Sequence, residues 1–262
     1  MPSTEYRDTA APPHSGDQRT AVVWDVLQPA VTRRARAAGR ATLDVLDTGG
    51  GTGQFAVPLA RLGHRVTVVD PSPDALFGLE RRAAEAGVAD RVRGVQGDAH
   101  GLFEVAERGG YDVVLCHGVL EYVDDPAEGL RNAVTALRPE GGTLSLLAAG
   151  LGGAVLARAL AGHFAEARQV LTAPEGRREA AEPRRFTPEQ LTDLVTASGL
   201  AVTAVHGVRI FSDLVPGALV DAEPAAREAL QALEAAAAAS PAFRAMATRV
   251  HVLAETPAGR PA

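Results

Sequence analysis

Apolar residues along this chain gather in short continuous runs, and segments with helical spacing separate the runs. Five segments are predicted strands, at residues 43–47, 64–70, 92–96, 111–116 and 143–147. The run at 111–116, YDVVLC, is continuously apolar, as expected of a strand covered on both faces. The segments between them, such as residues 74–86, repeat apolar side chains every three or four positions. This alternation predicts a parallel sheet with right-handed crossovers, which is an α/β fold.

The last third of the chain is less regular. Residues 152–164 can form a helix, and Thr187 with Gln190 forms a capping box that predicts the start of another. Runs at 200–208 and 249–255 are strand-like and are separated by an alanine-rich helical segment, so they can pair antiparallel. We therefore predict a Rossmann-like, doubly wound, mostly parallel seven-stranded sheet with an antiparallel strand at the edge.

Length and composition indicate one ordinary globular domain. The chain has 262 residues, of which 46% are hydrophobic and 22% charged. Residues 1–17 contain three prolines and few apolar groups, which predicts a flexible lead. Helical spacing begins near residue 20, so residues 18–256 are predicted to form the single domain and residues 257–262 a tail.

Charge and cysteine content exclude several classes of function. The net charge of −6 argues against broad attraction to nucleic acid, although a local basic patch stays open. The single cysteine rules out an intrachain disulfide, and no Cys/His cluster has the spacing of a metal site. No apolar window approaches the roughly 18 residues of a membrane span or resembles an export signal. We therefore expect no metal and no membrane contact, and a cytoplasmic protein.

Candidate chemistry is concentrated in the glycine-rich turn after the first predicted strand. Asp47 is followed by Gly49, Gly51 and Gly53 at alternate positions. Glycines there let a ligand approach the backbone and let the turn adopt positive φ. Asp70 ends the next strand, where a carboxylate can bind the two hydroxyls of a ribose. The pattern predicts a nucleoside-cofactor site, with a plain strand-to-helix turn as the alternative.

The spacing also separates two classes of cofactor. Dinucleotide sites use G-x-G-x-x-G and place a pyrophosphate at a helix N-terminus, whereas these glycines alternate and follow an acid. Asp47 would repel a phosphate but could help to hold the sulfonium and ammonium of S-adenosylmethionine. We therefore predict S-adenosylmethionine as the cofactor and keep a nicotinamide dehydrogenase as an alternative.

These features resemble class I S-adenosylmethionine-dependent methyltransferases. Within that class, several segments resemble the bacterial tRNA methyltransferases that esterify carboxymethoxyuridine at the anticodon wobble position, namely QRTAVVWDVL, VLDTGGGTGQ, LGHRVTVVDPS, CHGVLEYVDDP, LRPEGGTLSLL and HGVRIFSDL. The VLD and LRPEGG pieces are common to the whole superfamily. HGVLEYV, GVRIFSDL and the QR pair before a tryptophan-bearing helix are more particular.

The resemblance implies cofactor contacts at Arg19, Gly49, Gly50, Asp70, Ala99, His100 and His117. Gly51 and Asp47 belong to the same site by position, and Asp98 ends the third strand, where adenine lies in this fold. Arg19 could pair with the methionine carboxylate, or be a solvated surface arginine. Asp98 could instead form a turn, and His117 could bond the local backbone.

The methyl acceptor follows less directly from the sequence. A carboxylate acceptor needs no general base, so its main requirement is a clamp, for which Arg209 is our candidate. Tyr122 and Phe211 could stack on a nucleobase, although both could equally be core residues and Arg209 a surface charge. A hydroxyl or amine acceptor needs a base, and His117 would then make the rate depend on pH between about 6 and 9.

The resemblance is weakest where the relatives carry a lysine run. The corresponding residues, 173–185, here contain two arginine pairs, Arg177 with Arg178 and Arg184 with Arg185. RNA binding depends on phosphate neutralisation, so the missing basic groups favour a small-molecule carboxylate or hydroxyl as the rival acceptor, while the resemblance keeps tRNA as the leading one. A non-catalytic S-adenosylmethionine-binding protein is a third hypothesis. The acceptor, the oligomeric state and the role of residues 218–247 stay open.

Overall fold

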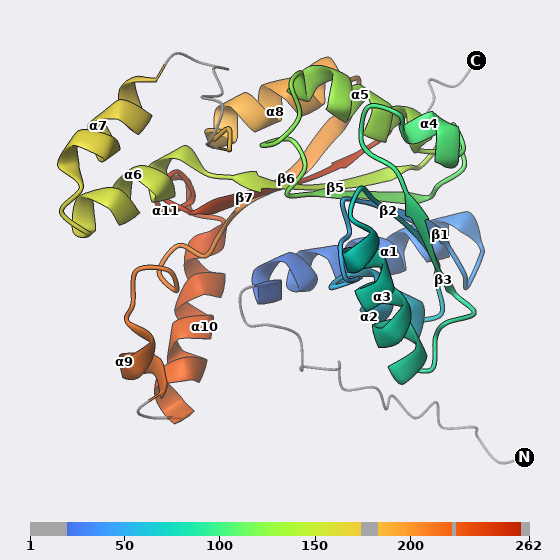
Figure 1. The fold of residues 1–262 in the computed structure, drawn as a ribbon, viewed down its shortest axis with the longest axis horizontal. Coiled ribbons are helices and arrows are strands. Elements are labelled where there is room, and N and C mark those ends of the chain that lie inside the picture. Colours follow the sequence, from blue (N-terminus) through green and yellow to red (C-terminus); the bar gives the residue numbers. More distant parts are fainter. Residues whose placement is uncertain (1–19, 174–182, 222–223, 258–262) are drawn as a thin grey trace, which may run out of the picture.

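The computed structural model describes residues 20–173, 183–221 and 224–257. Its centre is a seven-stranded sheet with the order β3-β2-β1-β4-β5-β7-β6 (Figure 1). The strands are β1 (Asp44–Thr48), β2 (Arg65–Asp70), β3 (Val92–Gln96), β4 (Val113–His117), β5 (Thr143–Ala149), β6 (Ala201–Val208) and β7 (Arg249–Glu255). All neighbouring strands are parallel except that β7 runs antiparallel to both β5 and β6. The predicted fold class is confirmed, with β7 inserted one place inside the edge.

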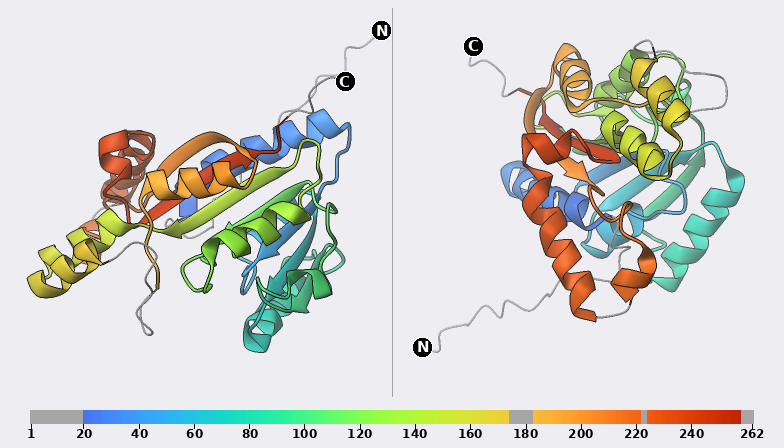
Figure 2. Two further views of the ribbon diagram at one scale, coloured as in Figure 1. Left: turned by 90° about the horizontal axis from the view of Figure 1, so that it is seen from above. Right: turned by 90° about the vertical axis from the view of Figure 1, so that its left-hand side faces the viewer.

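Helices cover both faces of the sheet (Figure 2). On one face, α1 (Ala21–Ala38), α2 (Ala56–Arg61) and α3 (Pro73–Glu85) pack on strand residues such as Val45 and Leu115. On the other, α4 (Leu102–Val105), α5 (Pro126–Ala136) and α8 (Pro188–Ala197) pack on residues such as Leu46 and Val114. Successive strand residues thus enter opposite cores, as the continuous apolar runs require.

Local sequence explains where several helices begin and end. The capping box is confirmed, because the Gln190 backbone N–H donates to Thr187 Oγ1 at 3.2 Å and the Thr187 N–H donates to Gln190 Oε1 at 2.9 Å. The helix predicted over residues 152–164 forms as α6 (Leu151–Leu160) and ends earlier than predicted, because the chain turns at Gly162 with φ +81°. A further helix that was not predicted, α7 (Phe164–Thr172), follows this turn.

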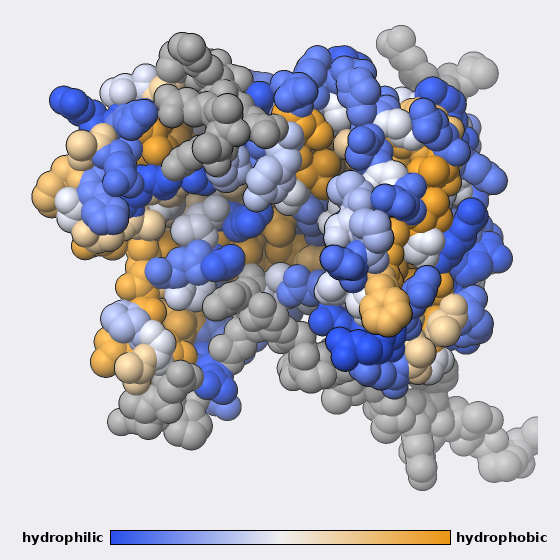
Figure 3. Space-filling view, viewed as in Figure 1, coloured by the Kyte–Doolittle hydropathy of each residue, from blue (hydrophilic) through white to orange (hydrophobic). Residues whose placement is uncertain are grey.

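Two helical arms extend from the side of the sheet that contains β6 and β7 (Figure 1). One arm is α6 with α7, and the other consists of α9 (Gly217–Asp221) and α10 (Pro224–Ala238), with α11 (Pro241–Arg244) leading back to β7. Apolar side chains are exposed on the first arm at Leu160, Phe164 and Leu171 (Figure 3). Within the described ranges, no helix combines the length and apolar character needed to cross a membrane.

A cluster of ion pairs lies at the amino-terminal ends of β1 and β4. The Asp112 carboxylate is fully buried and accepts a hydrogen bond from Arg34 Nη2 at 3.1 Å, and Arg138 Nε lies 3.3 Å away. Arg40 also bonds Asp112, and the Asp44 backbone N–H donates to it at 3.0 Å. This cluster ties α1 and the β1 and β4 strands together far from the predicted cofactor residues.

Candidate active site

A cavity of about 700 Å³ opens at the carboxyl ends of the first four strands. Its volume is in the range of sites for ligands the size of a nucleoside cofactor. Six predicted residues line it: Gly49, Asp70, Asp98, Ala99, His100 and Tyr122. The rest of the wall carries no signal in the sequence and consists of Thr48, Val69, Pro71, Gly97, Gly118, Val119, Val123, Asp124, Asp125 and Gly129.

The glycine-rich turn has the conformation that its spacing predicts. Gly49, Gly51 and Gly53 all have positive φ, between +54° and +79°. A Cβ at Gly49 would lie 2.7 Å from Val119 Cγ2, so a side chain there would obstruct the wall of the cavity. Gly50 and Gly51 do not line the cavity themselves, and they shape the turn beneath it.

The Asp70 carboxylate is held at the cavity by two backbone donors. Oδ2 accepts from the Gly51 N–H and Oδ1 from the Ser72 N–H, each at 2.9 Å. Every carboxylate oxygen has two acceptor positions, so each oxygen keeps one for a further donor. The geometry fits two ribose hydroxyls, which is the role that the sequence predicts.

Asp47 lies beneath the glycine turn and outside the cavity lining. Its side chain is buried, and Oδ2 has no hydrogen-bond partner among the described residues. A Cβ at Gly50 would lie 2.5 Å from this oxygen, so the turn itself covers the carboxylate. Burial, and then the charge of Asp70, raise the pKa of Asp47 to about 7. A nearby cation would favour its ionised form, so the site suits a positively charged ligand.

The third-strand residues combine both of the roles weighed from the sequence. Asp98 lines the cavity, and its Oδ1 accepts from the backbone N–H groups of His100 at 2.9 Å and Gly101 at 2.8 Å. The turn and the lining position are therefore both present. The Ala99 carbonyl accepts from Asn132 Nδ2 at 2.9 Å, a contact that no local pattern predicts.

His117 takes a different partner from the local backbone considered above. Its Nε2 lies 2.8 Å from Ser145 Oγ, which lies 2.8 Å from His251 Nε2, and its ring meets Phe55 edge-on. Burial, and then the positive charge of Arg249, lower the pKa of His117 to about 3. A pKa this low disfavours His117 as the base that a hydroxyl or amine acceptor would need near neutral pH.

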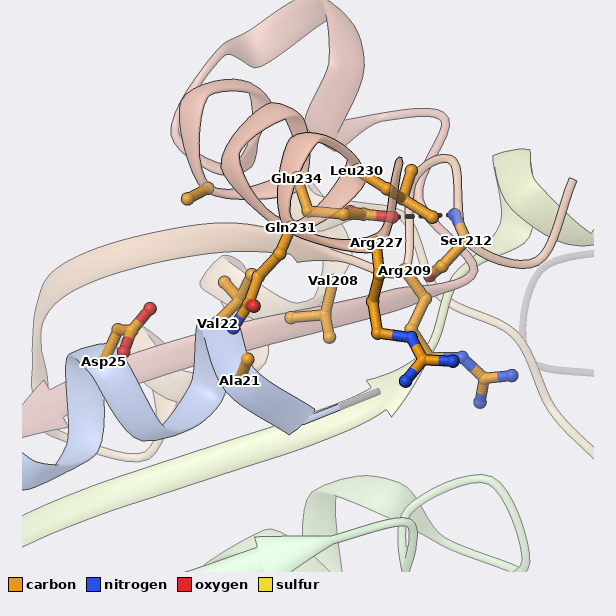
Figure 4. Close-up of a pocket in the computed structure, with 11 residues that line it drawn as sticks. Ala21, Val22, Asp25, Val208, Arg209, Ser212, Arg227, Leu230, Gln231 and Glu234 are labelled. Atoms are coloured by element: carbon orange, nitrogen blue, oxygen red, sulfur yellow. Dashed lines mark hydrogen bonds between the residues drawn. The ribbon is translucent and has the colours of Figure 1, made fainter. Parts of the chain in front are cut away.

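The three predicted acceptor residues do not lie together. Tyr122 is 59% exposed and lines the cavity, so it is not a core residue. Phe211 packs on Phe243 in a small apolar cluster, in agreement with the core alternative. The Arg209 guanidinium bonds Asp213 and, beside Arg227, lines a separate cavity of about 40 Å³ between α10 and the start of α1 (Figure 4).

Some predictions concern residues outside the described ranges. Arg19, Arg177 and Arg178 lie there, as do the predicted lead and most of the predicted tail. In the second arginine pair, Arg184 binds the loop that follows β4. Its backbone N–H donates to the Glu121 carbonyl at 2.9 Å, and its side-chain Nη2 donates to the Asp124 carbonyl at 3.1 Å. Across the residues that can be described, no group of three or more His, Cys, Asp or Glu side chains could hold a metal ion.

Comparison with known proteins agrees with this geometry. Residues 46–144 match the methyltransferase domain family. The chain is 30% identical over 198 residues to the tRNA 5-carboxymethoxyuridine methyltransferase of Escherichia coli K12, covering 76% of this chain and 73% of the relative. It is 37% identical over 167 residues to a ubiquinone biosynthesis O-methyltransferase of Methylobacterium nodulans, covering 63% of each.

The fold is similar to that of solved methyltransferase structures. A methyltransferase structure from Mesorhizobium loti superposes with a TM-score of 0.58 at 18% identity, covering 91% of this chain and all of that one. The cavity, the Asp70 carboxylate and the orphaned Asp47 oxygen fit S-adenosylmethionine, which is the cofactor of this enzyme class. The chain belongs to the class I S-adenosylmethionine-dependent methyltransferases.

Proposed function

We propose that this enzyme methylates a carboxylate oxygen, and that its acceptor is carboxymethoxyuridine at the wobble position of tRNA. The observation that supports a carboxylate acceptor is the buried environment of His117, which lowers the pKa of its imidazole. This imidazole ends β4 and bonds Ser145, and its low pKa leaves it a poor base at neutral pH. An acceptor that is already ionised needs no base. The identity of 30% with the Escherichia coli tRNA enzyme supports the choice of nucleoside.

In this reaction the main role of the protein is to orient the acceptor and the methyl donor. Bound S-adenosylmethionine supplies the methyl group: its C–S bond breaks as the C–O bond forms, sulfur keeps the electron pair, and no proton moves. Holding the acceptor oxygen in line with the methyl carbon can supply most of the rate enhancement. The exposed Tyr122 ring at the cavity is suited to stack on the acceptor base.

The cofactor residues then have separate proposed roles. Asp70 binds the ribose hydroxyls, the segment from Asp98 to His100 binds adenine, and Gly49 lets the cofactor approach the backbone. Asp47 offsets the positive charge of the sulfonium and ammonium from beneath the turn. We retain Arg19 as the partner of the methionine carboxylate.

A small-molecule O-methyltransferase is the second candidate. The relatives named for ubiquinone biosynthesis favour it, at 37% identity in the Methylobacterium nodulans enzyme. A hydroxyl acceptor must lose a proton, so a rate that rises with pH as the acceptor ionises would support this candidate. A carboxylate acceptor gives no such rise.

Nucleoside mass spectrometry of tRNA tests the proposal. Cells that lack this protein should lose the methyl ester of the wobble nucleoside and accumulate the free acid, and expression of the wild-type chain should restore the ester. Purified protein with labelled S-adenosylmethionine should then label that tRNA. An unchanged nucleoside profile, with no label transferred in vitro, would overturn the tRNA acceptor and favour the small molecule.

A further inference from the structure

We propose that Arg249 binds the acceptor carboxylate and that Glu121 positions the Arg249 guanidinium and offsets part of its charge. This inference rests on the proposed function, because it assigns the clamp that a carboxylate acceptor requires. The sequence assigns neither residue a role: Arg249 opens a strand, and Glu121 lies within the HGVLEYV segment, in the loop after β4.

The fold brings these two residues to the acceptor end of the site. Arg249 is the first residue of β7, in register between Ala149 of β5 and Val208 of β6. Its Nη1 donates to Glu121 Oε1 at 2.8 Å. Glu121 directly precedes Tyr122, which lines the cofactor cavity. The ion pair therefore bridges the start of β7 and the loop that follows β4.

The guanidinium also reaches the wall of the cofactor cavity. A Cβ at Gly118 would lie 3.7 Å from Arg249 Nη1, and Gly118 lines the cavity. The charge of Arg249 also contributes to the lowered pKa of His117, so its field is felt at the end of β4. Arg209, the clamp suggested by the sequence, instead bonds Asp213 and lines the other cavity.

Arg249 has hydrogen-bonding capacity left for a second carboxylate. Within the described chain, the bond to Glu121 is the only hydrogen bond of a guanidinium that carries five N–H donors. The Arg249 side chain is 33% exposed, whereas that of Glu121 is 1% exposed. Glu121 thus holds the guanidinium from the buried side and leaves the outer side open, where two parallel N–H groups can bind a carboxylate.

The ion pair also suits the change of charge during transfer. The acceptor starts as an anion and ends as a neutral ester, so a strong unpaired cation would stabilise the substrate more than the transition state. The negative charge of Glu121 weakens the attraction while leaving the N–H groups in place. The neutral product then binds Arg249 less well than the substrate, which favours release.

The test uses tRNA that carries unmethylated carboxymethoxyuridine, labelled S-adenosylmethionine and four full-length variants. Arg249→Gln should lower kcat/KM for the tRNA by about 30- to 100-fold through KM, in line with the loss of a charged bidentate contact. Cofactor affinity and the melting temperature should stay near wild type, and Arg249→Lys should recover part of the loss. Arg168→Gln, on exposed α7, is the control and should behave as wild type.

Glu121→Gln separates a clamp from a merely structural ion pair. The amide oxygen can still accept from Arg249, but the compensating charge is gone, so KM for the tRNA should fall and kcat should fall with it. A wild-type KM in folded Arg249→Gln would overturn the clamp, and so would parallel losses of cofactor affinity and stability in both Arg249 variants. Wild-type protein that binds S-adenosylmethionine but does not methylate this tRNA would overturn the proposed function itself.

Discussion

The Glu234 carboxylate on α10 accepts a hydrogen bond from the backbone N–H of Phe211 at 2.8 Å, which ties the alanine-rich helix to the turn after β6. The same carboxylate accepts from the N–H groups of Ile210 at 2.9 Å and Ser212 at 2.8 Å. Arg209 precedes them with φ +59°, so the three donors converge on one acceptor. This contact shows how the alanine-rich segment, left open by the sequence, is attached.

Replacing Glu234 with Gln should loosen α10. The amide offers one acceptor oxygen and turns its NH2 group toward backbone donors, so the free energy of unfolding should fall by ~2 kcal/mol. Urea denaturation measures the loss, and amide exchange at residues 210–212 should become faster. Glu228→Gln, exposed on the same helix, should change stability by less than ~0.5 kcal/mol. Equal effects of the two changes would contradict the attachment.

The Asp112 cluster should matter for stability and not for cofactor binding. Asp112→Ala leaves Arg34, Arg40 and Arg138 without their shared anion, so unfolding free energy should fall by ~3 kcal/mol. The cluster lies at the opposite ends of the strands from the cavity, and S-adenosylmethionine affinity should therefore be unchanged. Denaturation and calorimetry on one preparation check both statements. A large loss of affinity in still-folded protein would contradict them.

Replacement by alanine should destabilise the protein more at Gly53, which is closely surrounded, than at Gly199, which is not. A Cβ at Gly53 would overlap Leu79 Cδ1, and its φ is +79°. At Gly199 φ is +85° and nothing lies within 4 Å of such a Cβ. Gly199→Ala should cost ~1 kcal/mol from backbone strain alone, whereas Gly53→Ala should cost ~2 kcal/mol more through overpacking. Equal melting temperatures of the two variants would contradict this account.

Asp47 should make stability depend on pH. Its pKa of about 7 in the folded state lies above the ordinary value of 3.8, so the folded chain binds more protons between those limits. This group therefore contributes most stability below about pH 4 and loses it as pH rises through about 7, by up to ~4 kcal/mol. Asp47→Asn should remove this slope in urea unfolding measured from pH 4 to 8.

Cofactor binding should show the opposite dependence on pH. A cationic ligand favours ionised Asp47, so binding near pH 7 should release a proton and tighten as pH rises. Calorimetry in two buffers with different ionisation enthalpies measures the proton released. Equal heats in both buffers for the wild type, or the same release in Asp47→Asn, would show that another group responds.

The sequence predicts this fold well where local signals decide the structure. The third strand falls on residues 92–96 as predicted, with Val92 and Val95 as its two apolar residues. Gly49, Asp70 and Asp98 were found because the carboxyl ends of parallel strands meet at one edge. Gly162 turns the chain, so α6 ends at Leu160, before the predicted end at residue 164, and α7 was not predicted.

The separation of the three predicted acceptor residues has a topological cause. Tyr122 follows β4 and Phe211 follows β6, and the sheet order places β5 and β7 between those strands. Motif similarity alone cannot show this separation. The contacts from His117 to Ser145 and His251, and from Arg249 to Glu121, likewise join strands and loops far apart in the chain. Only the strand order brings such pairs together.

Calorimetric titration of S-adenosylmethionine into the wild type and into Asp70→Ala tests the central claim most directly. The wild type should bind one equivalent, and Asp70→Ala should bind at least ~30-fold more weakly, because the ribose loses a charged acceptor and the Gly51 turn loses its tether. Asp90→Ala, at an exposed position, should match the wild type. Folded wild-type protein that takes up no S-adenosylmethionine, or Asp70→Ala with unchanged affinity, would contradict the account.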